Sequence, residues 1–156
     1  NKAQTLRTPA SGFVSGITAD LCAASPRLWY GNVLAGVSDV VAEVSHGFGA
    51  TWAAASNDWS ETALPWTEGV TRIIKTMAYD RAGGQYLYWA DSDAATRGIW
   101  RAVLGASAVD APEQMVSGAR TFDIDWKTET LYYTTLDAPF HVYRLPLDTV
   151  GAAHTD

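Results

Sequence analysis

The sequence predicts an all-β fold made of repeated sheets, because three observations agree. The same ordered set of short apolar segments occurs three times along the 156 residues. These segments are rich in aromatic and β-branched residues and are bounded by turn-forming residues, which is typical of strands. No apolar stretch sustains the 3.6-residue spacing of a long amphipathic helix, although the segment from Val33 to Val41 is ambiguous.

Each copy of the repeat contains three segments in the same order. The first copy consists of Gly16–Asp20, Leu28–Asn32 and Val41–Gly47. The second copy consists of Thr76–Asp80, Leu87–Asp91 and Ile99–Gly105. The third copy consists of Thr121–Trp126, Leu131–Thr135 and Val142–Asp148.

The period of the repeat predicts the architecture. Asp80 and Asp125 lie 45 residues apart, whereas Asp20 and Asp80 lie 60 residues apart, and the excess falls in an insertion at 48–60. A period of about 40–50 residues is typical of the four-stranded blade of a β-propeller. The chain is therefore expected to form three blades of four antiparallel strands, at about 13–47, 71–105 and 119–148.

A fourth strand is predicted before each copy, at Ala3–Thr8, Glu61–Pro65 and Pro112–Ser117. On this interpretation the last blade lacks an outer strand and the first strand of the chain lacks a blade. The continuous apolar runs Leu87–Trp89 and Leu131–Tyr133 indicate sheets that are covered on both faces. Three blades do not close a propeller, so a further chain or segment is expected to complete it.

Charge and composition narrow the classes of partner. Seventeen acidic residues outnumber eleven scattered basic residues, which argues against a nucleic-acid surface and against an anionic membrane surface. Cys22 is the only cysteine, so no disulfide forms within the chain, and a small buried apolar role is expected for it. The sequence begins at Asn1 without a methionine, which is compatible with removal of a preceding segment.

Carboxylates offer the main candidates for polar chemistry. Asp20, Asp80 and Asp125 occupy the same place in each copy, so we expect them to cap the turn that follows each strand. The pairs in Asp91–Asp93 and Asp123–Asp125 could supply oxygen ligands to Ca²⁺, or could lie in solvated turns, the reading we prefer. The sequence shows no recognisable set of catalytic residues. The three histidines have no spacing that indicates a metal site, namely His46, His141 and His154.

Aromatic residues provide the candidate ligand-binding site. Four tryptophans lie on repeated strands and are expected in the core, namely Trp29, Trp89, Trp100 and Trp126. Three others belong to the insertion or to the strand after it, namely Trp52, Trp59 and Trp66. An indole in a polar loop can stack on a sugar or anchor a protein partner. The alternative is a loop folded back over the blade with these indoles buried.

The segment Leu87–Asp91 resembles the YWTD motif of the propellers in low-density-lipoprotein-receptor proteins. The flanking strands agree, since Gly16–Asp20 and Phe122–Trp126 resemble the first strand of such repeats, and Ile99–Gly105 and Val142–Asp148 resemble their third strand. Only the second copy keeps the aspartate of the motif. The resemblance implies a six-bladed propeller, of which this chain supplies half, and a rigid disc whose loops commonly bind protein ligands.

Two functions follow as hypotheses. The first is a non-enzymatic, lectin-like binding module that recognises protein or carbohydrate ligands through its loops, without a cofactor. The rival is a calcium-dependent hydrolase, because six-bladed relatives include lactonases and strictosidine-synthase-like enzymes. We further expect an extracellular or secreted protein whose propeller is completed by self-association into a homodimer or by a second chain. In the homodimer, each chain would lend Ala3–Thr8 to the last blade of the other.

Overall fold

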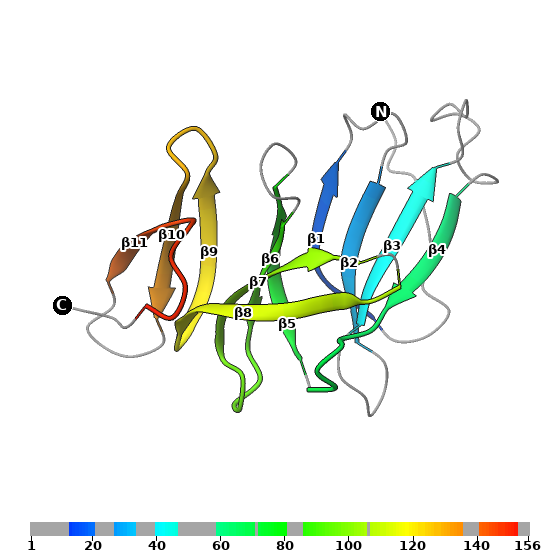
Figure 1. The fold of residues 1–156 in the computed structure, drawn as a ribbon, viewed down its shortest axis with the longest axis horizontal. Helices are drawn as coiled ribbons and strands as arrows, with labels where there is room; N and C mark the ends of the chain where they lie inside the picture. Colours follow the sequence, from blue (N-terminus) through cyan, green and yellow to red (C-terminus); the bar gives the residue numbers. More distant parts are fainter. Residues whose placement is uncertain are drawn as a thin grey trace.

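The computed structural model describes residues 13–20, 27–33, 40–46, 59–70, 72–80, 86–105, 107–135 and 141–152. These residues form eleven strands in three antiparallel sheets (Figure 1). No described residue is helical, and this part of the chain accordingly offers no helix with the length and hydropathy to cross a bilayer. The all-β prediction is confirmed.

Each sheet is a meander in which every strand pairs antiparallel with the next one along the chain. The first sheet contains β1 (Phe13–Asp20), β2 (Arg27–Val33), β3 (Val40–His46) and β4 (Trp59–Leu64). The second contains β5 (Ile74–Tyr79), β6 (Tyr86–Asp91), β7 (Gly98–Leu104) and β8 (Val109–Ser117). The third contains β9 (Ala119–Asp125), β10 (Thr130–Thr135) and β11 (Val142–Pro146).

The strands coincide with the repeated segments of the sequence. Two of the predicted fourth strands are present as β4 and β8, and each pairs with the third strand of the copy before it. The third predicted strand of this type, Ala3–Thr8, lies outside the described residues. β4 begins at Trp59, which pairs with His46, so the last two positions of the loop predicted at 48–60 belong to a strand.

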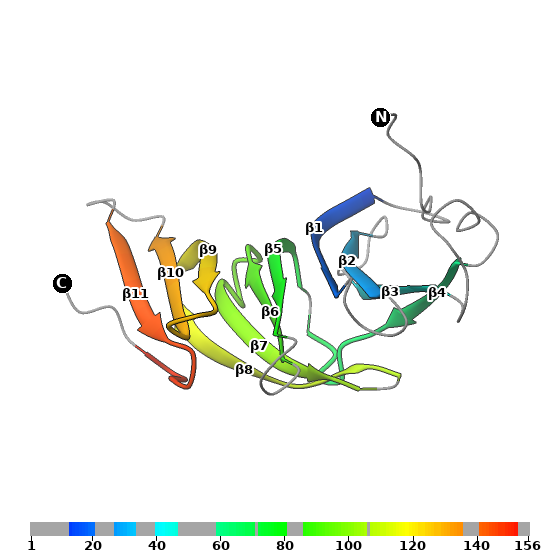
Figure 2. The ribbon, with the colours of Figure 1, turned by 90° about the horizontal axis from the view of Figure 1, so that it is seen from above.

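The three sheets lie side by side in a fan (Figure 2). Their first strands, β1, β5 and β9, are neighbours at the centre of the fan, and the later strands of each sheet extend outward. The hydroxyls of Thr76 on β5 and Thr121 on β9, which are 45 residues apart, lie within 3.2 Å of one another. Equivalent positions of two repeats therefore meet at the centre.

The repetition extends to irregularities of the backbone. In all three sheets the register between the first and second strands shifts once, which leaves one unpaired residue: Gly16, Lys75 and Arg120 respectively. Such bulges bend a strand and increase its twist. Lys75 and Arg120 are separated by the repeat period of 45 residues, so the second and third sheets bend at the same place.

Two apolar clusters fill the spaces between neighbouring sheets. The first joins Trp29, Val41, Leu64 and Trp66 to residues of the second sheet, and the second joins residues of the second and third sheets. Along β6, Leu87 and Trp89 belong to the first cluster, whereas Tyr88 and Ala90 belong to the second. Because side chains alternate along a strand, the middle sheet is buried on both faces, as predicted for Leu87–Trp89.

Two glycines allow the first sheet to approach the second. A Cβ at Gly16 would stand 2.8 Å from Cγ2 of Ile74 and 2.9 Å from Cγ of Met77. A Cβ at Gly31, on the neighbouring strand β2, would stand 3.1 Å from Cβ of Ile74. Real Cβ atoms essentially never come within 3.0 Å of another heavy atom, so Gly16 depends on the missing side chain, while a Cβ at Gly31 would require Ile74 to shift slightly.

The third sheet has one face that is exposed in the described part of the chain. Leu131 and Tyr133 are buried in the second cluster, but Tyr132 between them is 42% exposed. Only one face of this sheet packs against another described sheet. Within the described part of the chain, Leu131–Tyr133 is therefore covered on one face, and cover on the other face stays a prediction.

Candidate functional site

Of the tryptophans proposed to bind ligand, Trp59 and Trp66 lie toward opposite ends of β4. Trp66, in the connection from β4 to β5, is 7% exposed, and its ring centroid lies 5.0 Å from that of Trp89 in the first apolar cluster. Trp59 is the first residue of β4 and therefore lies at the other end of that strand. Trp52 lies outside the described residues. A ligand-binding role for Trp52 and Trp59 stays a prediction, whereas Trp66 is part of the core.

Trp126 was expected in the core but is 45% exposed. It follows β9 directly and packs edge-on against Tyr88 of the second sheet, with 6.0 Å between the ring centroids. The reason for the error is its position: the strand ends at Asp125, so Trp126 already belongs to the turn. The sequence does contain a signal for the exposure of Trp126, because this residue follows the repeated aspartate at which the strand ends.

Trp126 lies at the end of the molecule from which the insertion departs. The arrowheads of β1, β3 and β9 point to the same end in Figure 1. β9 ends immediately before Trp126, and β3 ends at His46, which pairs with Trp59 at the start of β4. This loop end, defined by the termini of β1, β3 and β9, thus carries an exposed indole and both ends of the insertion.

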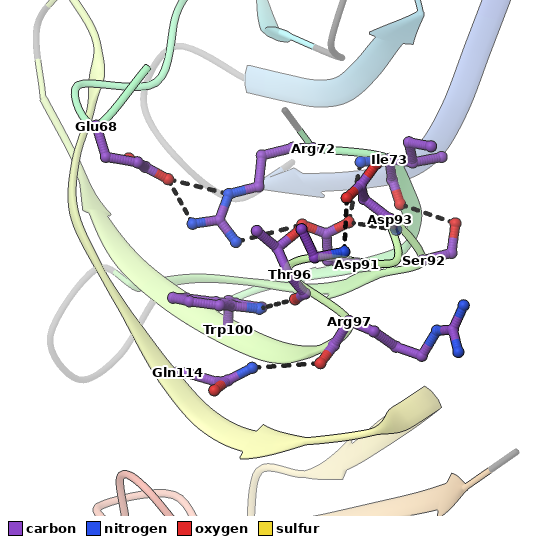
Figure 3. Close-up of polar contacts among 11 residues, drawn as sticks. Glu68, Arg72, Ile73, Asp91, Ser92, Asp93, Thr96, Arg97, Trp100 and Gln114 are labelled. Carbon is purple, nitrogen blue, oxygen red and sulfur yellow. Dashed lines mark hydrogen bonds and ion pairs between the residues drawn. The ribbon is translucent and has the colours of Figure 1, made fainter. Parts of the chain in front are cut away.

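The opposite end of the second sheet holds a buried ion pair (Figure 3). Nη1 of Arg72 donates to Oδ2 of Asp91 at 3.2 Å, and both side chains are at most 2% exposed. Arg72 also donates from Nε and Nη2 to Oε1 of Glu68. Since Arg72 lies in the connection between the first two sheets, these bonds fix that connection to the end of β6.

The Asp91 carboxylate is saturated by donors of the protein. Its Oδ1 accepts from the backbone N–H groups of Ile73 at 3.0 Å and Asp93 at 2.9 Å. Its Oδ2 accepts from the hydroxyl of Thr96 at 2.7 Å in addition to Arg72. A buried carboxylate with four donors is satisfied, so its role is to hold the backbone in place.

Three indoles surround the Arg72 guanidinium. Its Cζ lies 3.9 Å from the ring centroid of Trp100, and 5.7 and 5.8 Å from those of Trp89 and Trp66. A desolvated cation over an aromatic face is held by the ring quadrupole. Trp100 is fixed in turn, because its Nε1 donates to the carbonyl of Thr96 at 2.7 Å. The cation therefore fills the space between the indoles, and the cluster supports the fold.

Of the repeated aspartates, Asp125 has the predicted capping role. Oδ1 of Asp125 accepts from the backbone N–H of Lys127 at 3.0 Å, and Oδ2 accepts from the hydroxyl of Thr128 at 2.7 Å. The hydroxyl of Thr128 and then the N–H of Lys127 lower the pKa of this carboxyl. Both bonds lie within the turn that joins β9 to β10.

The carboxylates of the acidic pairs considered as calcium ligands accept hydrogen bonds from nearby groups of the protein. Asp93 accepts from the N–H of Ala95 at 2.9 Å, and Asp123 accepts from the N–H of Ile124 at 2.9 Å. Within the described ranges, no three His, Cys, Asp or Glu side chains are grouped so that they could hold a metal ion. His141 is exposed and packs edge-on against Tyr143, at 5.9 Å between centroids.

A second polar group joins the second and third sheets. Arg101 donates from Nε to Glu113 at 3.0 Å and from Nη1 to the carbonyl of Leu147 at 2.6 Å, which is beyond β11. Its Cζ lies 4.8 Å from the ring centroid of Tyr86. Burial, with a smaller contribution from Asp80, raises the pKa of the neighbouring Tyr88 to about 12. Tyr88 therefore stays a neutral core residue at physiological pH.

No protein-family model, curated protein or solved structure matches this chain.

Proposed function

We propose that the chain is a non-enzymatic binding module. It forms three blades of a YWTD-like six-bladed propeller and recognises protein or carbohydrate ligands through the loops at its loop end. The blade assignment is supported by three meander sheets whose first strands are neighbours at the centre of a fan. It is supported further by bulges at equivalent positions, 45 residues apart, in the second and third sheets.

The exposed indole of Trp126 carries the ligand-binding proposal. Its ring leans edge-on against the buried ring of Tyr88, so one side is fixed while 45% of the residue is exposed. A large, rigid aromatic residue loses little conformational entropy on binding, and such residues dominate binding energy. Trp59 begins β4 at the same end, and Trp52 belongs to the insertion that departs from there. An extracellular location agrees with this function and is part of the proposal.

The test compares four variants on a glycan microarray and on an immobilised peptide library. Replacement of Trp52, Trp59 or Trp126 by Ala should lower binding by about tenfold or more, as loss of an aromatic anchor does. His141→Ala is the matched control, because it removes an exposed ring at the other end of the third sheet. Equal binding by all four variants and the unmodified chain, or binding to neither array, would contradict the proposal.

A further inference from the structure

The third sheet has one exposed face, defined by Tyr132 and Val142. We call it the forward face, because the equivalent faces of the first two sheets pack against the next sheet along the chain. The equivalents of Tyr132 are Trp29 and Tyr88, which are 1% and 2% exposed, whereas Tyr132 is 42% exposed. The equivalents of Val142 are Val41 and Ile99, which are both 0% exposed, whereas Val142 is 72% exposed. In the first two sheets, these positions pack against the following sheet.

The complementary surface is exposed at the other end of the fan. The first strand of a sheet packs Met77 or Phe122 against the sheet before it, and each is 7% exposed. Ile17 is the equivalent residue of β1, and it is 58% exposed. On this back face of the first sheet, defined by Ile17, the cross-strand partner Tyr30 is 3% exposed, so Ile17 is the exposed residue that the forward face of another sheet would cover.

We propose that the forward face of the third sheet binds the back face of the first sheet in a second copy of this chain. The contact is continuous with two interfaces already present inside the molecule, because forward faces cover back faces between the first and second sheets and between the second and third. The fan of β1, β5 and β9 supplies the direction in which a fourth sheet is added (Figure 2). Two copies joined head to tail in this way bring six sheets around one centre.

Polar residues surrounding the apolar centre favour an interface between chains over a permanent core. Thr134 and Asp123 stand on this face where Ala90 and Ala78 stand on the second sheet, and Arg144 is exposed beside Tyr132. Apolar residues within a polar rim are typical of surfaces that are solvated before two chains associate. The inference concerns a sheet face, so it stands or falls separately from ligand binding at the loop end.

The test is the molar mass of the chain in light scattering at micromolar concentration, together with two surface variants. The unmodified chain should have about twice the mass of 16.8 kDa. Val142→Asp and Ile17→Asp should each raise the dissociation constant of the dimer by about tenfold or more, because each places a charge in an apolar contact. Val150→Asp is the matched control, since Val150 is 42% exposed in the turn after β11.

Mixing the two variants distinguishes a head-to-tail contact from a symmetric one. The Val142→Asp chain keeps an intact back face and the Ile17→Asp chain keeps an intact forward face, so the mixture should recover dimers that neither variant forms alone. A contact between two forward faces would be insensitive to Ile17→Asp and would show no recovery. That result, a monomeric unmodified chain, or unchanged dimerisation of both variants would overturn the proposal. Unchanged circular dichroism verifies that each variant is folded.

Discussion

Asp91 has a role that depends on its carboxylate, and the equivalent residues of the other two sheets carry no carboxylate. The corresponding positions are Asn32 in the first sheet and Thr135 in the third. In the second sheet, the guanidinium of Arg72 reaches this position from the preceding connection. Asp91 ends the segment that resembles the YWTD motif, and four donors converge on its carboxylate.

Replacing Asp91 by Asn should lower the free energy of unfolding by about 3 kcal/mol, since breaking a buried ion pair leaves an uncompensated charge. The cost should lie at the lower end of the usual range because Glu68 still contacts Arg72. Urea unfolding followed by tryptophan fluorescence measures the change. Asp123→Asn, at an exposed position of β9, is the control and should change stability by about 0.5 kcal/mol or less. Equal effects of the two substitutions would show that the Arg72–Asp91 pair contributes nothing.

At the scale of single elements, the contact between β1 and β5 depends on the absence of a side chain at Gly16. The nearest atoms belong to Ile74, a β-branched residue that is completely buried and has few alternative rotamers. Room for a methyl group therefore has to come from a shift of the strands. Gly16 therefore allows the close approach of the first two sheets.

Gly16→Ala should destabilise the protein by about 1–3 kcal/mol, the usual cost of overpacking a core. The matched control is Thr62→Val on β4 of the same sheet, where the side chain is exposed and a β-branched residue suits the strand. Thermal melting of both variants gives the comparison. A neutral or stabilising effect of Gly16→Ala would mean that β1 and β5 are not packed as closely as described.

The order of the strands could be predicted from the sequence, but the surroundings of individual side chains could not. Apolar segments bounded by turn residues locate β5, β6 and β7 to within two residues. The same pattern placed Trp126 in the core, because a segment alone does not show that a strand ends one residue earlier. Arg72 was not identified at all, since its partner Asp91 is 19 residues away and the indoles around it come from three separate segments.

At the scale of the whole molecule, the fan of three sheets suits both a binding module and a calcium-dependent hydrolase. Both hypotheses use the same scaffold, and a fold alone does not choose between them. The difference lies in what the carboxylates do. Those that can be followed accept hydrogen bonds from their own turns, as Asp93 and Asp125 do, or from a buried arginine, as Asp91 does.

Calcium is therefore expected to leave the melting temperature unchanged. A bound ion would stabilise the native state by mass action. A site whose dissociation constant for Ca²⁺ is far below the added concentration would therefore raise the melting temperature clearly. The measurement compares the chain in millimolar CaCl₂ with the chain in excess chelator, and MgCl₂ serves as the control for ionic strength. A rise specific to Ca²⁺ would favour the hydrolase instead.

The return of the chain after β11 has a consequence for cooperativity. The N–H groups of Gly151 and Ala152 donate to the carbonyls of Gln114 and Met115, so the segment that leaves the third sheet is pinned to the outer strand of the second. Arg101 fastens the same stretch through the carbonyl of Leu147. Local opening of the third sheet alone would have to break these bonds as well as the shared apolar cluster. The second and third sheets should thus exchange their amide hydrogens as one foldon, which hydrogen exchange followed residue by residue would test.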